Sequence, residues 1–248
     1  SHQRVHAGVT SFPTVRHPIE VGIEGRGIRS GWDGHDLEIY RWSAGVLKQI
    51  TNNAFDDTVP RINANGWLAW QGWTNQYSGI NPGVNNWDIY LYNNSAIQNV
   101  SLKNPYADTR PQLNNIGALA WNYNDGTDIE IAFWKAGVLA LITDNNFSDG
   151  YRRLNNKDQI AYCGHDGNDY EIYLWRSGTP TQKITDNTTD DINLRLNDNG
   201  EIVWQGYDIS GMRDSTGGDW EIYYYANAKI EQLSNNEYDD ILPRITQG

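Results

Sequence analysis

Acidic residues recur at regular spacing along the chain, so carboxylates are the first candidates for chemistry. One set stands at the start of apolar–aromatic runs: Glu38, Asp88, Glu130, Glu171 and Glu221. A second set follows each of these by about 20 residues: Asp57, Asp108, Asp149, Asp191 and Asp240. A carboxylate-dependent glycoside hydrolase or lyase would need two acids in different environments. Because these acids look equivalent from copy to copy, the pattern favours a structural role over divided catalytic roles.

A basic or amide residue stands four positions after each member of the second set. A feature present in nearly every copy is best explained by what every copy needs, namely contact with its neighbour. In the copy that starts at Asp108, Gln112 takes the place of the arginine, and Arg110 stands two residues earlier. We therefore predict a structural ring of ion pairs or loop caps. Its members are Asp57, Arg61, Asp108, Asp149, Arg153, Asp191, Arg195, Asp240 and Arg244.

Short Asp-Gly segments superficially resemble calcium-binding loops, with oxygen ligands at alternate positions. They begin at Asp33, Asp125 and Asp166. Calcium takes six to eight oxygens, however, and the twelve-residue EF-hand pattern is absent from the sequence. Since tight hairpin turns alone explain Asp-Gly, we predict no metal and no cofactor, with calcium kept open as the alternative. The five histidines form no spaced ligand pair, and the single Cys163 excludes an intramolecular disulfide.

Aromatic residues with a polar group are abundant, with 11 Trp and 15 Tyr against 4 Phe. Those that recur in every copy are expected in the core. The others gather near two long insertions, residues 73–86 and 207–219, where loops on a rigid scaffold would form a binding site. Trp and Tyr stack on the apolar face of a sugar, whose hydroxyls need hydrogen bonds. The predicted ligand-binding residues are Trp32, His35, Trp73, Tyr77, Trp87, Tyr207 and Trp220.

The spacing of the acidic set gives a repeat of about 42 residues, with intervals of 50, 42, 41 and 50. One copy reads as four short strands, at residues 151–155, 159–163, 170–175 and 182–185, separated by Asn- and Gly-rich turns. No helical periodicity competes with this pattern. Four-stranded units at this spacing are typical of the blades of a β-propeller. We therefore predict an all-β chain of four-stranded antiparallel blades.

The two ends of the sequence suggest how the ring closes. Residues 242–246 match the first strand of a unit, whereas the first copy has only a weak match before its third strand. We predict that the C-terminal strand pairs with the N-terminal strands to close five blades, with six as the alternative. The predicted divisions are an extension at 1–24 and a propeller at 25–248. Its units span about 25–56, 57–107, 108–148, 149–190 and 191–239, followed by a closing strand at 240–248.

The repeat resembles the TolB-like, or WD40-like, β-propeller family of bacterial envelope proteins. The resemblance rests on Thr185-Asp186-Asn187, on residues 195–204 and on Trp220-Glu221-Ile222-Tyr223, and it covers about residues 27–246. It implies a propeller outside the cytoplasm, either periplasmic, on the surface or secreted. Members of the family bind ligands, hold partners or accompany a separate catalytic domain, so no active site is implied. The chain departs from the pattern by using Asn-x-Asn-Gly where the family has Ser-Pro-Asp-Gly.

Composition narrows the classes of function further. With 19 Lys+Arg and 31 Asp+Glu, the formal net charge of −12 argues against nucleic acid as a partner. No apolar run is long enough to insert into a membrane. The chain begins without a leader, so we expect any signal peptide to have been removed. We predict a non-catalytic binding propeller that recognises a glycan, with an envelope protein as the alternative partner and the oligomeric state open.

Overall fold

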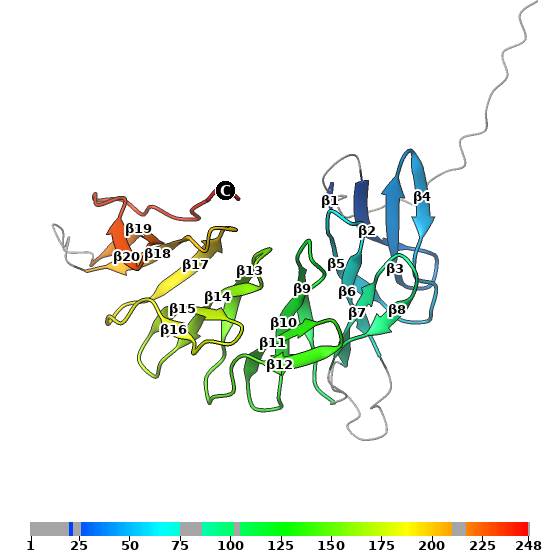
Figure 1. Cartoon of the computed structure of the whole chain (residues 1–248), viewed down its shortest axis with the longest axis horizontal. Helices are drawn as coiled ribbons and strands as arrows, with labels where there is room; N and C mark the ends of the chain where they lie inside the picture. Colours follow the sequence, from blue (N-terminus) through cyan, green and yellow to red (C-terminus); the bar gives the residue numbers. More distant parts are fainter. Residues whose placement is uncertain (1–19, 22–25, 75–85, 102–104, 210–216, 248) are drawn as a thin grey trace, which may run out of the picture.

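The computed structural model describes residues 20–21, 26–74, 86–101, 105–209 and 217–247. These residues form five four-stranded antiparallel sheets and no helix, as expected for an all-β chain. Within each sheet the strands lie side by side in sequence order. Figure 1 shows the sheets following one another along an arc, with the first and last sheets at its two ends.

The strands of the first three sheets have the following bounds. The first sheet contains β1 (Glu20–Val21), β2 (Arg26–Trp32), β3 (Leu37–Ser43) and β4 (Val46–Gln49). The second contains β5 (Asp57–Ile62), β6 (Leu68–Trp73), β7 (Trp87–Tyr92) and β8 (Ile97–Asn99). The third contains β9 (Thr109–Leu113), β10 (Leu119–Asn124), β11 (Ile129–Lys135) and β12 (Val138–Leu141).

The last two sheets repeat this arrangement. The fourth sheet contains β13 (Gly150–Leu154), β14 (Gln159–His165), β15 (Tyr170–Arg176) and β16 (Gln182–Lys183). The fifth contains β17 (Asp191–Leu196), β18 (Ile202–Asp208), β19 (Asp219–Ala226) and β20 (Lys229–Gln232). The four strands predicted for residues 151–185 therefore exist, with ends that differ by one or two residues.

The hydrophobic core lies between consecutive sheets. In the described part of the chain it consists of four clusters, one at each junction of two sheets. At the last junction, for example, Ile172 and Leu174 of the fourth sheet pack with Leu196 and Trp204 of the fifth. Each sheet is therefore stabilised by burying its faces against its neighbours, which is the physical reason for the repeat.

A bulge interrupts the first strand of four of the sheets. Two residues after the repeating aspartate, the backbone adopts a left-handed conformation, and the pairing with the second strand shifts there. The residues are Val59 (φ 51°), Arg110 (φ 56°), Tyr151 (φ 49°) and Asn193 (φ 56°). Such a conformation is rare outside glycine and asparagine. Its recurrence shows that the bulge belongs to the repeat.

A ladder of asparagines joins the sheets at the turn between the first and second strands. Asn63 Nδ2 donates to the Asn114 carbonyl, Asn114 Nδ2 to the Asn155 carbonyl, and Asn155 Nδ2 to the Asn197 carbonyl, each over 2.9 Å. All four asparagines are buried. The ladder explains the use of Asn-x-Asn-Gly in the turns, because the first asparagine carries the bond from one sheet to the next.

The C-terminal segment does not close the ring by the predicted pairing. The edge beside β2 is occupied by β1, which pairs through Glu20 with Ile28, and residues 233–247 form no strand. Leu242 nevertheless has the left-handed φ of the bulge (56°), and its N–H donates to Gln205 Oε1 over 3.2 Å. The segment thus adopts the conformation of a first strand beside the fifth sheet, and closure of a five-bladed ring stays a prediction.

Glycine in the second strand makes room for an aspartate and a tyrosine. A Cβ on Gly206 would lie 2.4 Å from Asp191 Oδ1 and 2.9 Å from Tyr223 Cε2. Tyr223 in turn stacks on Trp204, with ring centroids 5.8 Å apart. The second and fourth sheets share the arrangement, whereas the third sheet has Tyr123 and Ala132 at the glycine and tyrosine positions. In the third sheet the large side chain is thus on the second strand and the small one on the third, so the same strand pair still fills the space.

Gly206→Ala should therefore destabilise the protein by about 1–3 kcal/mol, the usual cost of overpacking a rigid site. Thermal unfolding followed by circular dichroism measures the effect. Gly150→Ala is the matched control, since its Cβ would meet nothing within 4 Å and its backbone lies outside the left-handed region. Equal melting temperatures for the two variants would contradict the packing argument.

Candidate functional site

The buried aspartates at the start of the first strands hold the loops that precede them. Trp70 Nε1 donates to Asp57 Oδ1 over 2.8 Å, and Asn53 Nδ2 donates to Asp57 Oδ2 over 2.7 Å. Equivalent asparagine bonds hold Asp149, Asp191 and Asp240. Burial raises the pKa of Asp57 and of Asp191 to about 7, against the effect of these donors. These contacts give the aspartates a structural role.

Ion pairs or loop caps were the prediction for the arginines four residues later, and the described hydrogen bonds of these arginines go to backbone carbonyls and not to the aspartates. Arg153 Nη1 donates to the Arg152 carbonyl over 2.9 Å, and Arg195 Nη1 donates to the Leu194 carbonyl over 2.8 Å. Arg61 and Arg244 likewise donate to the carbonyl of the preceding residue. The bulge accounts for the difference, because an extra residue reverses the alternation of a strand and separates aspartate and arginine onto opposite faces.

The other repeating acids, at the start of the third strands, bind the loop after the fourth strand. Glu38 Oε1 accepts from the Asn53 N–H over 2.6 Å, and Glu171 Oε1 accepts from the Asn187 N–H over 2.7 Å. Glu130 and Glu221 make the same contact with Asn145 and Asn236. Asp88 instead accepts from the side chain of Asn99.

The predicted ligand-binding aromatics are divided among three sheets. Trp32 and His35 are exposed at the β2–β3 turn of the first sheet. Trp73 and Trp87 face each other across β6 and β7, and Tyr207 and Trp220 across β18 and β19, with ring centroids 5.3 Å apart in the second pair. Tyr77 lies outside the described residues. The structure therefore arranges these side chains as separate pairs at the ends of their hairpins.

Two of these aromatics line cavities that occupy equivalent places in the repeat. Trp73 borders a cavity of about 380 Å³ with Phe55, and the two rings lie 5.2 Å apart. Tyr207 borders a cavity of about 470 Å³ beside Asn187 and Thr189. Each cavity combines an aromatic wall with side-chain amides or hydroxyls, a combination that suits a small polar ligand.

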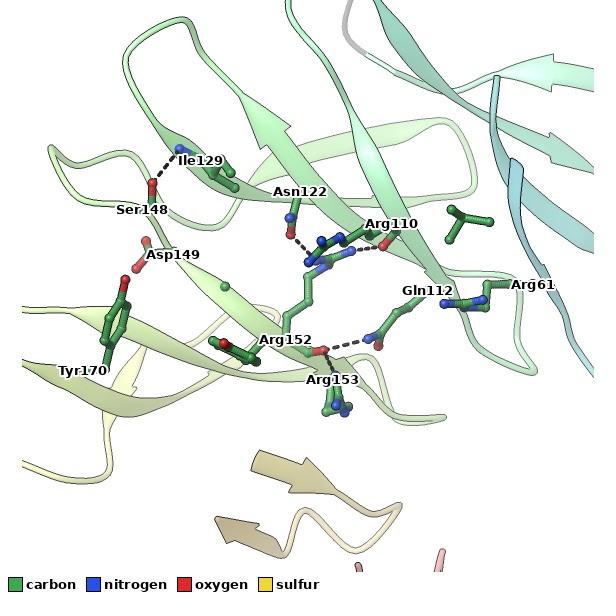
Figure 2. A pocket seen from close by; sticks show the side chains of 13 residues that line it. Arg61, Arg110, Gln112, Asn122, Ile129, Ser148, Asp149, Arg152, Arg153 and Tyr170 are labelled. Atoms are coloured by element: carbon green, nitrogen blue, oxygen red, sulfur yellow. Dashed lines mark hydrogen bonds between the residues drawn. The ribbon is translucent and has the colours of Figure 1, made fainter. Parts of the chain in front are cut away.

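In the part of the chain that the structure describes, four arginines gather elsewhere, at the first strands of the second, third and fourth sheets. Arg61, Arg110, Arg152 and Arg153 line a cavity of about 490 Å³, which we call the arginine cavity. Figure 2 shows the Arg152 guanidinium beside Asn122 and Arg110, with Gln112 between Arg152 and Arg61. The bulge contributes directly, since Arg110 is itself the residue in the left-handed conformation.

Arg152 is the most deeply buried of these arginines, with 4% of its surface exposed. Its guanidinium donates to Asn122 Oδ1 and to the Arg110 carbonyl, both neutral acceptors (Figure 2). Its Nε is buried without a hydrogen-bond partner. No carboxylate of the described residues lies within ion-pair distance of Arg152. A buried guanidinium with only neutral partners is costly, and an anion in the cavity would offset that cost.

Neighbouring guanidinium groups lower one another's pKa across the cavity. Burial, with the charges of Arg153, Arg110 and Arg61, lowers the pKa of Arg152 to about 9. Burial and nearby arginines also lower the pKa of Arg153 to about 10. Both groups remain positively charged at neutral pH. Among the described residues, Asp149 is the one acidic residue that lines the cavity, so the four arginines leave it positive and favour anions.

Sequence reasoning missed this site because it assigned the repeating arginines to a structural ring of ion pairs or loop caps. A signal was present in the adjacent pair Arg152-Arg153 and in Arg110, which no other copy shares. In a chain of net charge −12, non-repeating arginines beside a repeating one indicate a local function.

Comparisons with known proteins identify the fold. No protein-family model matches the chain, and no curated protein matches it in sequence. Dipeptidyl peptidase 4 of Porphyromonas gingivalis aligns with a TM-score of 0.60 at 15% identity, over 85% of this chain and 39% of its own. The propeller domain of the Pyrococcus furiosus trilobed protease gives 0.56 at 8% identity, over 85% and 64%. A puromycin-hydrolysing peptidase of Mycobacterium tuberculosis gives 0.54 at 13% identity, over 85% and 36%.

The chain therefore spans less than two thirds of each of these proteins. TolB of Acinetobacter baumannii, at a TM-score of 0.46 and 12% identity over 83% of this chain and 50% of its own, is too distant to test the TolB-like resemblance. Among the described residues no helix is long and apolar enough to cross a membrane. At these identities the likeness shows the β-propeller fold, and the chain is an all-β protein of propeller architecture.

Proposed function

We propose that the chain is a binding propeller that holds an acidic segment of a partner protein in the arginine cavity. The observation that carries the proposal is Arg152, a buried guanidinium with neutral partners at the wall of a cavity that Arg110 and Arg153 also line. Charge-assisted hydrogen bonds from arginine to carboxylate are among the strongest polar contacts in proteins. A side-chain or terminal carboxylate would supply the missing counter-charge.

The charge of the whole chain restricts the ligand to a short anion. The formal net charge of −12 repels extended polyanions such as nucleic acids, while the arginine cavity attracts a carboxylate locally. The cavity of about 490 Å³ accommodates a few residues of a peptide. An acidic tail or loop of a protein fits both conditions.

Titration with a fluorescein-labelled peptide of five glutamates, followed by fluorescence anisotropy, tests the proposal. Arg153→Gln removes one cation from the wall and should weaken binding at least tenfold, since a hydrogen bond to a charged group contributes about 1.5–3 kcal/mol. Arg176→Gln, at the far end of β15, is the matched control and should leave binding unchanged. Melting temperatures of both variants verify that they fold.

Binding that is equally strong in Arg153→Gln and the wild type would overturn the proposal. So would binding of a five-lysine peptide with the same affinity. Inorganic phosphate should compete weakly with the glutamate peptide. Its negative charge would bind the arginines, but it is smaller than the peptide and makes fewer contacts with the cavity.

A second candidate function is recognition of a glycan, which the two equivalent cavities beside Trp73 and Tyr207 favour. A sugar ligand would also suit a location outside the cytoplasm, as the TolB-like resemblance implies. A glycan array tests this candidate. Trp73→Ala should remove a specific signal while lowering the melting temperature by only a few degrees, since Trp73 lies at the end of its strand. A signal that survives this change would argue against the cavities.

A further inference from the structure

Three hairpins between second and third strands each gather three carboxylates. The first-sheet cluster is Asp33, Asp36 and Glu38; the third-sheet cluster is Asp125, Asp128 and Glu130; the fourth-sheet cluster is Asp166, Asp169 and Glu171. In each cluster, one oxygen from every residue lies within 4.8 Å of the others. Three negative charges so close together repel one another unless a cation or protons neutralise them.

Buried oxygens without partners point to a ligand at these clusters. Asp36 and Asp169 are each 7% exposed, and neither carboxylate oxygen of either residue has a hydrogen-bond partner. Glu38 and Glu130 are 0% and 1% exposed, and the Oε2 of each is also unpartnered. Buried polar atoms nearly always have a partner. These oxygens are therefore available to bind a ligand that is not part of the protein.

The turn fixes the first aspartate of each cluster while leaving one of its oxygens available. Asp33 Oδ1 accepts from the N–H groups of His35 and Asp36, over 2.8 and 3.2 Å. Asp125 Oδ1 accepts from the N–H groups of Thr127 and Asp128, over 2.7 and 3.0 Å. In both turns the described bonds go to Oδ1, so Oδ2 can face the cluster.

The fourth-sheet cluster already contains a cation. Lys183 Nζ lies 2.9 Å from Asp166 Oδ2 and 3.6 Å from Glu171 Oε1. Lys183 stands opposite Tyr173 on the neighbouring strand, and the equivalent positions are Gln49 in the first sheet and Leu141 in the third. The lysine shows that a positive charge fits at this place in the repeat, and the other two clusters lack it.

The remaining two sheets satisfy their acids with neutral side chains. In the second sheet Asn86 replaces one carboxylate, and Asn99 Nδ2 donates to Asp88 Oδ2 over 2.7 Å. In the fifth sheet, Ser234 Oγ donates to Glu221 Oε2, and Gln232 Nε2 donates to Asp208 Oδ2. Among the described residues, the first-sheet and third-sheet clusters thus receive no hydrogen bond or ion pair from this position, where Gln49 of the first sheet leaves the Asp36 oxygens without partners and Leu141 of the third sheet is apolar.

We propose that the first-sheet and third-sheet clusters each bind one calcium ion. Calcium accepts six to eight oxygens in flexible geometry, so three carboxylates, some of them bidentate, with water can complete its shell. The ion would tie the hairpin to the buried glutamate at the start of the third strand. Bound calcium would raise the free energy of unfolding by an amount set by its concentration and its Kd, because the unfolded chain has no such site.

Calorimetric titration of the EDTA-treated protein with calcium chloride, together with melting temperatures, tests the proposal. The wild type should bind two ions and melt at a higher temperature in calcium than in EDTA. The double variant Asp36→Asn/Asp128→Asn should lose both effects. In EDTA it should melt above the wild type, because each change removes like-charge repulsion, so loss of binding is distinguished from failure to fold.

Lys183→Met provides the converse test. Removing the internal cation should open the fourth-sheet cluster and raise the number of bound calcium ions from two to three. The exposed variant Asp144→Asn is the control for nonspecific charge and should bind as the wild type does. Absence of a calcium-dependent rise in the wild type, or a rise that persists in the double variant, would overturn the proposal.

Discussion

Asn114→Ala is expected to lower the free energy of unfolding by about 4 kcal/mol. The Asn114 carboxamide makes four hydrogen bonds. Its Nδ2 donates to the Asn155 carbonyl over 2.9 Å and to Asp158 Oδ1 over 2.8 Å. Its Oδ1 accepts from the N–H groups of Ile116 and Ala118, over 3.2 and 2.8 Å.

Alanine would leave these partners behind, several of them buried, and each unsatisfied buried group costs about 1–3 kcal/mol. Urea unfolding measures the loss directly. Asn114→Asp separates the two halves of the network, since it retains the acceptor oxygen but loses both donated bonds and faces Asp158. It should fall between wild type and alanine in stability, or below alanine if the repulsion dominates.

The neighbouring Asn115→Ala is the matched control. Asn115 Oδ1 accepts a single bond, from the Ala64 N–H over 2.9 Å, in a more exposed position. A loss of less than about 1 kcal/mol is expected there. If both alanine variants were equally stable, the ladder would not be what joins the sheets.

Much of the fold could be predicted because the residues that recur in the sequence make contacts that every sheet needs. The acid at the start of the third strand, the aspartate at the start of the first and the Asn-Gly turn each recur because each makes the same contact in successive sheets. Glu171 with Asn187 and Asp191 with Trp204 are examples. Spacing between such residues therefore indicated the order of the strands in the complete copies.

The candidate site was harder to predict, because it depends on a departure from regular strand geometry. The prediction of ion pairs or loop caps followed from the recurrence of these residues in every copy. Aspartate and arginine four residues apart would share a face only in a regular strand. The left-handed residue between them is not a glycine; it is Tyr151 in the fourth sheet, for example, and nothing in its type indicates a bulge. A bulge at that point directs the arginines toward the cavity and leaves the aspartates with Trp and Asn partners.

The predicted pairing of the C-terminal segment with the N-terminal strands is absent for a related reason, while closure of a five-bladed ring stays a prediction. Residues 240–246 do have the aspartate, the left-handed residue and the arginine of a first strand, as the pattern indicated. Sequence alone could not show that the edge beside β2 is already filled by β1. A two-residue strand leaves too short a pattern to recognise.

Stability is expected to fall as the pH rises from about 4 to about 8, and Asp108 should be a main cause. Asp108 is fully buried, with neither carboxylate oxygen hydrogen-bonded, and burial raises its pKa to about 8. Between its unfolded and folded pKa values, the acid holds its proton in the folded state and releases it on unfolding. The unfolded state then binds fewer protons, so the free energy of unfolding decreases with pH. The full effect of this one group is roughly 6 kcal/mol.

Asp108→Asn isolates this contribution, because asparagine has nearly the same shape and no titrating proton. The variant should gain stability over the wild type at pH 8 and differ little at pH 4, as measured by urea unfolding in EDTA. Asp108 is the best choice among the buried aspartates, since burial raises its pKa to about 8, against about 7 for Asp57 and Asp191. EDTA removes any calcium from the third-sheet cluster, so that ion binding does not contribute to the result. Asp57 and Asp191 titrate in the same direction and will leave a residual slope. The exposed Asp144→Asn should reproduce the wild-type curve. A variant curve at Asp108 parallel to the wild type would mean that this carboxylate is ionised in the folded protein and has a partner.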